Sequence, residues 1–241
     1  MLALTGQVAL ITGASSGIGK AIALALAQQG AYLCLVGRQP ETLDAVAHTA
    51  RATSSQVLCY QADLALESDI QHLAANVEKD CEGVDLLIHS AGVIDLGGID
   101  SASVADLDRQ YRVNLRAPYV LTQALLPTLR SRKGQIVYIN SSVGLNARAG
   151  VGQYAATKHA LRGFADSLRE EVNREGVRVL SVFLGRTATP MQAAVHKMEG
   201  ARYRPENLLQ PEDVASVVVN ALRLPRTAEV TDVYVRPLLK S

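Results

Sequence analysis

The feature that most constrains the fold is a regular alternation of short apolar runs with helical patterns along the 241 residues. The runs are rich in Val, Leu and Ile and lack polar alternation, which predicts strands buried on both faces of a sheet. Strands that alternate with helices are joined by right-handed crossovers, so the sheet is expected to be parallel and doubly wound. About seven strands are predicted, at 7–11, 32–36, 57–60, 85–88, 136–139, 177–183 and 230–235.

Composition is consistent with one domain that spans residues 1–241. Hydrophobic residues make up 48% of the chain, which can therefore bury a sizeable core, and no linker-like segment divides it. The formal net charge is +1 with both signs interspersed, so we do not expect a nucleic acid partner. The first strand begins early, without an export pattern, and no apolar stretch approaches the ~20 residues of a membrane span. We therefore expect a soluble, cytoplasmic protein.

The cysteines and histidines do not suggest a metal site. Cys34, Cys59 and Cys81 are an odd number at wide spacing, and the first two stand in apolar, strand-like runs that are typical of buried free thiols. The five histidines show neither i, i+4 pairing nor cysteine partners. We predict that the protein binds no metal ion.

A glycine-rich turn follows the first predicted strand. The segment Thr12-Gly13-Ala14-Ser15-Ser16-Gly17-Ile18-Gly19 lies between that strand and a helix that stops near Gly30. Backbone N–H groups and the dipole at such a helix N-terminus favour a pyrophosphate, and glycines allow its close approach. The spacing differs from the usual Gly-x-Gly-x-x-Gly, so the turn is informative chiefly through its position. It predicts a dinucleotide site.

Small and polar residues follow successive predicted strands. Besides the glycine turn, they stand at 37–38, 62–64, 91–92, 141 and 185. In doubly wound sheets ligands sit beyond the carboxyl ends of the strands, so we expect these segments to meet at one crevice.

A tyrosine and a lysine stand four residues apart at Tyr154 and Lys158. On a helix this spacing places a phenol and an ammonium on one face. A free phenol has a pKa near ~10 and an adjacent cation favours the phenolate, so Tyr154 can exchange a proton nearer neutral pH. The pair is a candidate for general acid–base catalysis, although the same spacing also occurs on helices without a catalytic role.

In these two motifs the chain resembles the short-chain dehydrogenase/reductase family, in its single-domain branch. The glycine turn corresponds to the family's dinucleotide turn, and Tyr154 with Lys158 to its active-site pair. Asn114 matches the family's asparagine, on a helix predicted over about 107–130. Ser141 lies thirteen residues before Tyr154, the family's usual separation, and is therefore preferred to Ser142. The resemblance implies a Rossmann-like sheet and the catalytic set Asn114, Ser141, Tyr154 and Lys158.

The resemblance also implies a role for each of these four residues. Tyr154 gives its proton to a carbonyl oxygen during reduction, or accepts one from an alcohol, while hydride passes to or from a nicotinamide. Lys158 lowers the pKa of Tyr154 and holds the nicotinamide ribose. Ser141 hydrogen-bonds the substrate oxygen, and Asn114 holds a water that links Lys158 to solvent. A Ser141 that only caps a helix and an Asn114 that only binds backbone are the alternatives.

The end of the second strand bears on the choice of cofactor. Gly37 stands where the family's NAD-dependent members usually have Asp, and the next residue, Arg38, suits a 2′-phosphate. NADP(H) is therefore favoured over NAD(H), with a solvated loop arginine as the alternative. By resemblance, Asp63 hydrogen-bonds adenine and Leu64 lies beside the ring. The implied cofactor residues are Gly13, Ser15, Ser16, Gly17, Ile18, Gly19, Arg38, Asp63, Leu64, Ala91, Gly92, Tyr154, Lys158, Thr187 and Thr189.

Two segments depart from the family pattern. The family's Asn-Asn-Ala-Gly is His89-Ser90-Ala91-Gly92 here, so a shorter hydroxyl replaces an amide that is expected to brace the sheet. We expect His89 to form a wall of the adenosine site, with a catalytic His89 as the alternative. Leu184 stands where the family has a proline before Gly185, yet the threonines of 187–189 remain available to the nicotinamide carboxamide.

Together these residues predict an NADP(H)-dependent oxidoreductase that reduces a ketone, an aldehyde or a 3-oxoacyl group to an alcohol, or runs in reverse. A catalytically silent nucleotide-sensing protein is the alternative from another class. Among enzymes, a 3-oxoacyl carrier-protein reductase is the nearest alternative. Its candidate docking residues are Arg109, Arg112, Arg116, Arg130, Arg132 and Lys133.

The segment near 190–210 is expected, by resemblance, to cover the substrate, and a helix is predicted to open at Pro211. Helices near 107–130 and 157–174 carry apolar stripes that fit either subunit contacts or an internal core. The resemblance favours a homo-oligomer, a dimer or a tetramer. We expect a small-molecule carbonyl or alcohol substrate and no membrane partner.

Overall fold

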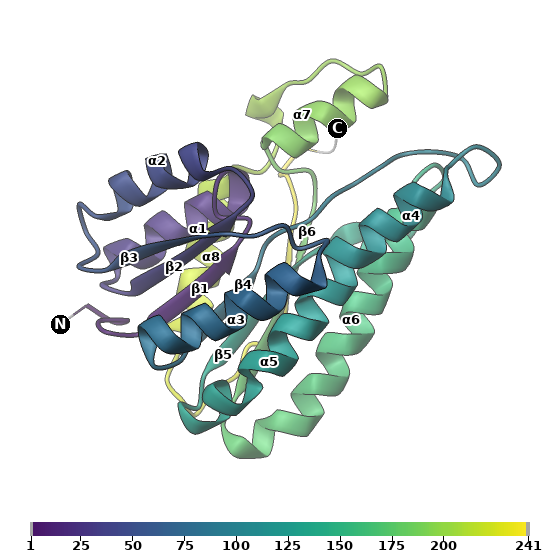
Figure 1. Cartoon of the computed structure of the whole chain (residues 1–241). Helices are drawn as coiled ribbons and strands as arrows, with labels where there is room; N and C mark the ends of the chain where they lie inside the picture. Colours follow the sequence, from purple (N-terminus) through teal and green to yellow (C-terminus); the bar gives the residue numbers. More distant parts are fainter. Residues whose placement is uncertain (1, 240–241) are drawn as a thin grey trace.

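The computed structural model describes residues 2–239, and its centre is one parallel sheet of seven strands (Figure 1). The strands lie in the order β3-β2-β1-β4-β5-β6-β7. The chain therefore adds strands outward in one direction from β1 and in the other from β4, which confirms the doubly wound, Rossmann-like arrangement. The strand bounds are β1 Val8–Thr12, β2 Tyr32–Gly37, β3 Val57–Gln61, β4 Leu86–His89, β5 Gln135–Ser141, β6 Arg178–Leu184 and β7 Asp232–Val235.

Each predicted strand is present, with bounds that agree to within two residues. All residues of β1, β4 and β6 are buried, as the absence of polar alternation predicted. The edge strand β7 is less buried, because it has a neighbour on one side alone.

Helices cover both faces of the sheet and bury two separate cores (Figure 1). One layer shares a cluster with Ile22 and Val218, and consists of α1 Gly17–Gln28, α2 Pro40–Ala50 and α8 Pro211–Leu222. The other layer shares a cluster with Leu125 and Tyr138, and consists of α3 Glu67–Cys81, α5 Ala117–Ser131 and α6 Gly152–Val172. The two layers fix the strands from both sides, so the strand ends are held in place.

The helix predicted over 107–130 contains a π-turn. Helix α4 spans Val104–Tyr111, the π-turn spans Arg112–Arg116, and α5 follows directly. A π-turn shifts the phase of the side chains, and Asn114 within it is buried. Such turns occur often at functional sites. The helix predicted near 157–174 begins earlier than expected, at Gly152.

The segment near 190–210 forms α7 (Pro190–Met198) and a short 3-10 turn (Pro205–Asn207). In Figure 1 α7 stands apart from the two helix layers, at the top of the molecule. Thr189 caps this helix, because its Oγ1 accepts a hydrogen bond from the Gln192 N–H at 3.1 Å. Helix α8 opens at Pro211, as predicted, behind a capping box.

Cys34, Cys59 and Cys81 are free thiols. Cys34 is buried, as predicted, whereas Cys59 is half-buried. Cys34 Sγ lies 3.2 Å from Cys81 Sγ, a contact that their sequence spacing did not indicate. Among residues 2–239 there is no cluster of three potential metal-ligating side chains, and no helix has the length and apolarity of a membrane span.

Candidate active site

The glycine turn joins the end of β1 to the start of α1, as predicted. Gly13 has φ +67°, and a Cβ there would lie 2.8 Å from Ala91 Cα, so the turn approaches the segment after β4 closely. A Cβ at Gly19 would collide with the Gly13 carbonyl oxygen. These glycines therefore allow the N-terminus of α1 to reach the crevice between the strand ends.

The N-terminus of α1 fits an anion. Ser16 is the N-cap of this helix, all of which lies within residues 2–239. Its side chain makes no capping hydrogen bond, and the first turn holds no acidic residue. The first N–H groups of a helix lack intrahelical partners, and their dipole favours negative charge. A pyrophosphate would satisfy both requirements, so the turn fits a dinucleotide.

A pocket of about 210 Å³ lies beside the turn. Segments after β1, β2, β3 and β4 all contribute to it, so strand ends that are distant in sequence meet at one crevice, as expected. The predicted cofactor residues that line this pocket are Gly13, Ser15, Ser16, Gly17, Ile18, Gly19, Arg38, Asp63, Leu64, Ala91, Gly92 and Thr189.

A second cavity, of about 420 Å³, adjoins the first. The two share six lining residues, which are Ile18, Ser90, Ala91, Gly92, Thr189 and Met191. The second cavity is also lined by Ser141, Tyr154, Lys158 and Thr187. Three of the four predicted catalytic residues therefore face one cavity beside the nucleotide pocket. We refer to it as the catalytic cavity.

Tyr154 is a phenol at neutral pH. Burial raises its pKa to about 12, and a hydrogen bond with the Ser141 side chain acts in the opposite direction. The net shift is upward, so the expectation of a Tyr154 pKa nearer neutral pH is wrong for the protein alone. The physical reason is desolvation, because burial disfavours the charged phenolate and is the largest cause of the shift.

Lys158 is buried between α6 and β5, with 4% of its surface exposed. Its Nζ donates a hydrogen bond to the Ile139 carbonyl oxygen at 3.1 Å. Burial lowers the pKa of Lys158 to about 8, because desolvation disfavours the ammonium. The side chain is therefore charged at pH 7 and loses its charge slightly above it.

Ser141 contacts Tyr154, which supports its choice over the adjacent serine. Its Oγ also accepts a hydrogen bond from the Val143 N–H at 3.4 Å. Ser141 therefore caps a short helical turn as well, as in the alternative. The Ser141 backbone N–H donates to Asn140 Oδ1 at 2.7 Å. The end of β5 is thus fixed where it carries Ser141.

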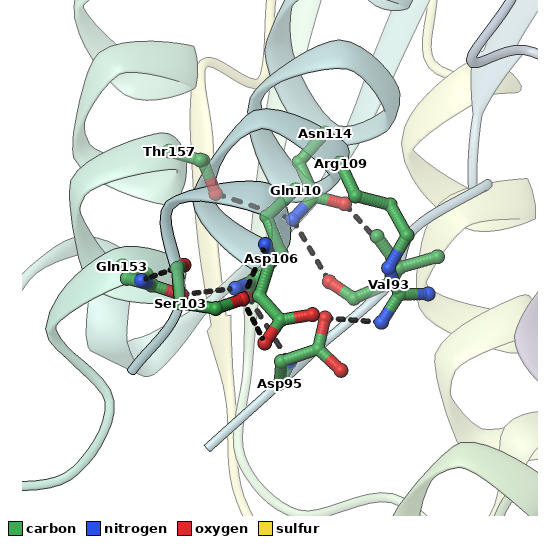
Figure 2. A network of polar contacts seen from close by, with 9 residues as sticks. All are labelled: Val93, Asp95, Ser103, Asp106, Arg109, Gln110, Asn114, Gln153 and Thr157. Atoms are coloured by element: carbon green, nitrogen blue, oxygen red, sulfur yellow. Dashed lines mark hydrogen bonds and ion pairs between the residues drawn. The ribbon is translucent and has the colours of Figure 1, made fainter. Parts of the chain in front are cut away.

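Asn114 holds the segment after β4 (Figure 2). Its Oδ1 accepts from the Val93 N–H at 2.8 Å, and its Nδ2 donates to the Val93 carbonyl at 2.9 Å and to Thr157 Oγ1 at 3.2 Å. These are three of the four hydrogen bonds that an amide can make. The side chain therefore binds backbone, as in the alternative, and the water link to Lys158 stays a prediction.

Two glutamines outside the predicted set extend this network (Figure 2). Gln110, which is buried in α4, accepts from the Asp95 N–H at 3.2 Å and donates to Gln153 Oε1 at 3.1 Å. Gln153 donates to the Ser103 carbonyl at 2.8 Å and directly precedes Tyr154. The network thus ties α4 to the first turn of α6. The sequence signal was a polar residue one helical turn before Asn114.

His89 does not form a wall of the adenosine site, and that prediction is wrong. The residue is 4% exposed, and its ring stacks on Tyr138, with 4.9 Å between the ring centroids. His89 Nε2 is hydrogen-bonded to Thr122 Oγ1 at 2.9 Å, and burial lowers the pKa of His89 to about 3. Side chains alternate along a strand, so His89 faces α5 and lines neither cavity. The catalytic alternative is excluded for the same reason.

Thr12 braces the segment after β4, where the family pattern has a second amide. Its Oγ1 accepts hydrogen bonds from the N–H groups of Ser90 and Ala91, at 3.1 and 3.2 Å. Leu184, the other departure, is buried at the end of β6 and lines the catalytic cavity. Thr187 follows it and is held by a bridge to Leu209.

The protein-family model for short chain dehydrogenases matches residues 7–200 of this chain. The chain belongs to the short-chain dehydrogenase family. An uncharacterized oxidoreductase of Staphylococcus aureus strain USA300 is 32% identical to this short-chain dehydrogenase over 239 residues, which are 99% of this chain and 100% of that protein. The chain is therefore an oxidoreductase of this family.

Solved structures of other short-chain dehydrogenases share the fold. A metagenomic short-chain oxidoreductase in complex with NADP is 34% identical, with a TM-score of 0.85 over 99% of this chain and 100% of that one. L-Sorbose reductase from Gluconobacter frateurii, complexed with NADPH and L-sorbose, is 26% identical, with a TM-score of 0.87 over 97% and 96%. The similarity thus extends over nearly the whole chain.

Proposed function

We propose that this short-chain dehydrogenase is an NADP(H)-dependent oxidoreductase that reduces a ketone, an aldehyde or a 3-oxoacyl group to an alcohol, or catalyses the reverse reaction. One observation carries the proposal: Ser141, Tyr154 and Lys158 line a single cavity that adjoins the pocket of the glycine turn. Carbonyl reduction needs a proton at oxygen and a hydride at carbon. The cavity offers the proton donor, and the pocket fits the nucleotide that carries hydride.

Each residue has a distinct task in the proposed reaction. The bound nicotinamide cofactor supplies or accepts the hydride. Ser141 hydrogen-bonds the carbonyl oxygen and holds it beside the Tyr154 hydroxyl, which lines the same cavity. Tyr154 gives its proton to that oxygen, and the Lys158 ammonium stabilises the phenolate that remains. In alcohol oxidation the proton returns to Tyr154.

Arg38 favours NADP(H) over NAD(H). It lines the nucleotide pocket at the end of β2, where Gly37 offers no carboxylate to a ribose hydroxyl. A guanidinium pairs with a phosphate through several N–H donors. Relatives whose structures contain NADP or NADPH support the same choice.

Ion pairs argue against the carrier-protein reductase. Four of the six basic residues suggested as docking groups face acidic side chains, which weakens their attraction for an acidic partner. The pairs are Arg109–Asp95, Arg116–Glu67, Arg130–Glu175 and Arg132–Asp85. The silent sensor is disfavoured because it does not need a proton donor beside the nucleotide pocket.

We also infer that residues 1–241 act as one catalytic domain in a cytoplasmic homo-oligomer, a dimer or a tetramer. Met191, Gln192 and Val195 of α7 line the catalytic cavity, which supports the segment near 190–210 as a substrate cover. Tyr119 on α5 is 47% exposed, which supports subunit contacts through this helix. Light scattering after gel filtration measures the subunit number, and a monomer would contradict the oligomer.

Calorimetric titration with NADPH and with NADH tests the proposed function, followed on the same sample by a panel of ketones, aldehydes and 3-oxoacyl thioesters. We expect tighter binding of NADPH and a fall in nicotinamide absorbance with at least one carbonyl compound. Binding without turnover across the panel would favour the sensor. A protein that binds neither nucleotide would contradict the cofactor site itself.

A further inference from the structure

The charged side chains that line the catalytic cavity are all cationic. They are Arg148, Lys158 and Arg186, and within residues 2–239 no Asp or Glu lines this cavity. In the proposed reaction Lys158 serves Tyr154 and the cofactor. The two arginines therefore determine the potential in the rest of the cavity.

Arg186 is fixed by an acidic side chain behind the cavity wall. Its Nη1 and Nη2 donate to the Glu199 carboxylate at 2.8 and 2.9 Å, and this bidentate pair links the end of β6 to the end of α7. Burial alone would raise the pKa of Glu199, but Arg186 and Arg148 together lower it. Glu199 is therefore ionised at neutral pH.

Arg148 is the less constrained of the two arginines. Its side chain is 49% exposed, and its Nη2 donates one hydrogen bond to Glu199 Oε1 at 3.2 Å. A guanidinium has five N–H donors, so most of those on Arg148 are available. One carboxylate faces two guanidiniums, which leaves a charge of about +1 at the edge of the cavity.

We propose that the catalytic cavity accepts a small oxo acid, and that Arg148 is the specificity-determining residue that binds its carboxylate. The inference rests on the proposed function, because it assigns the carbonyl group to Ser141 and Tyr154. A substrate carboxylate neutralises the remaining positive charge and pairs with the donors of Arg148. Between the two ends, Ile94, Val143 and Val195 offer apolar contacts to the carbon chain.

The test compares each of two oxo acids, acetoacetate and 4-oxopentanoate, with its methyl ester, in which the charge is absent. In at least one pair, we expect kcat/KM for the acid to be at least ~10-fold higher than for its ester. A difference of this size corresponds to the free energy of one charge-assisted hydrogen bond. Arg148→Met keeps the apolar stem of the side chain. It should remove this advantage by raising KM for the acid, while kcat/KM for the ester is unaffected. Arg223→Met, on an exposed arginine just after α8 and outside the cavity, is the matched control and should retain it.

Equal kcat/KM for acid and ester in the wild type would overturn the proposal. An equal loss for both in Arg148→Met would also overturn it, because the role would then be structural. Binding of 3-hydroxybutyrate and its methyl ester to the NADPH-loaded protein needs no turnover. Selective binding of the acid that Arg148→Met abolishes, without turnover of any carbonyl, would support carboxylate recognition and contradict the proposed carbonyl reduction instead.

Discussion

Burial shifts the pKa values of Tyr154 and Lys158 in opposite directions. Burial disfavours the phenolate and the ammonium alike, so it raises the pKa of Tyr154 to about 12 and lowers that of Lys158 to about 8. At neutral pH the pair is a phenol beside an ammonium. This is the protonation state that gives a proton to a carbonyl oxygen, so the protein alone is prepared for reduction.

Replacement of Tyr154 by Phe removes the proposed proton donor and leaves the ring. We expect turnover to fall by at least ~100-fold, because general acid catalysis typically contributes 10²–10⁴-fold. The Kd for NADPH should change little, as measured by calorimetric titration. Tyr234→Phe, on the exposed edge strand β7, is the control and should be as active as the wild type. Retained turnover in Tyr154→Phe would remove this residue from the mechanism.

The pKa of Lys158 predicts a limb in the pH profile of the reductase reaction. Above about pH 8 the side chain loses its proton, and with it the charge that stabilises the Tyr154 phenolate. We expect kcat/KM for NADPH, which reports the free enzyme, to fall as pH rises through about 8. Tyr154 stays protonated over this range and adds no limb of its own. A profile that is flat from pH ~7 to ~9.5 would contradict this assignment.

At the scale of elements, a buried hydroxyl connects β4, β5 and α5. Thr122 Oγ1 on α5 lies 2.9 Å from both His89 Nε2 and the Tyr138 hydroxyl. All three side chains are buried, so each polar atom needs a partner within the protein. The contact explains how a histidine can replace an amide at the end of β4.

Thr122→Val conserves shape and removes this shared partner. Two buried polar atoms then lose a hydrogen bond, and each unsatisfied group costs about 1–3 kcal/mol. We expect the free energy of unfolding in urea to fall by about 2 kcal/mol or more. Thr122→Ser keeps the hydroxyl and loses one methyl group, so it should cost about 1 kcal/mol. A variant with Val as stable as the one with Ser would show that the hydroxyl contributes little.

The sequence predicted the strands well because each one is a short apolar run that ends in small or polar residues. Such a signal is local, as at Val8–Thr12 and Arg178–Leu184. The π-turn at Arg112–Arg116 could not be predicted in the same way. Its helix has a continuous helical pattern, and the irregular turn coincides with the packing of Asn114 on Val93 and Thr157.

The site was predictable where its residues belong to one motif. The glycine turn and the spacing of Tyr154 and Lys158 are read directly along the chain. The side of β4 on which His89 lies, and its bond to Thr122, depend on a partner 33 positions away. The pair of Arg148 and Glu199 spans 51 positions. Contacts of this kind arise from the topology of the fold, so no recognisable pattern in the sequence indicates them.

The whole molecule joins two halves of the sheet at the crevice. β1 and β4 are neighbours at the centre, and β2 and β3 extend to one side while β5, β6 and β7 extend to the other. The nucleotide pocket takes residues from the β1–β3 half and from the β4 segment, and the catalytic cavity takes Ser141 and Thr187 from the other half. A dinucleotide bound there would contact both halves and would stabilise the folded chain.

This linkage makes cofactor preference measurable as stability. A ligand at 100 times its Kd adds about 2.7 kcal/mol to the free energy of unfolding, whereas one at its Kd adds about 0.4.

Arg38→Asp replaces a phosphate-binding guanidinium by a carboxylate, which repels a 2′-phosphate and can accept a hydrogen bond from a ribose hydroxyl. We expect NADPH to raise the thermal midpoint less in Arg38→Asp than in the wild type, and NADH to raise it more. Arg223→Asp, at an exposed position just after α8 and outside the pocket, makes the same charge change and should keep the wild-type order. Because the two variants differ only in where the charge is reversed, an unchanged preference in both would mean that the 2′-phosphate contacts residues other than Arg38.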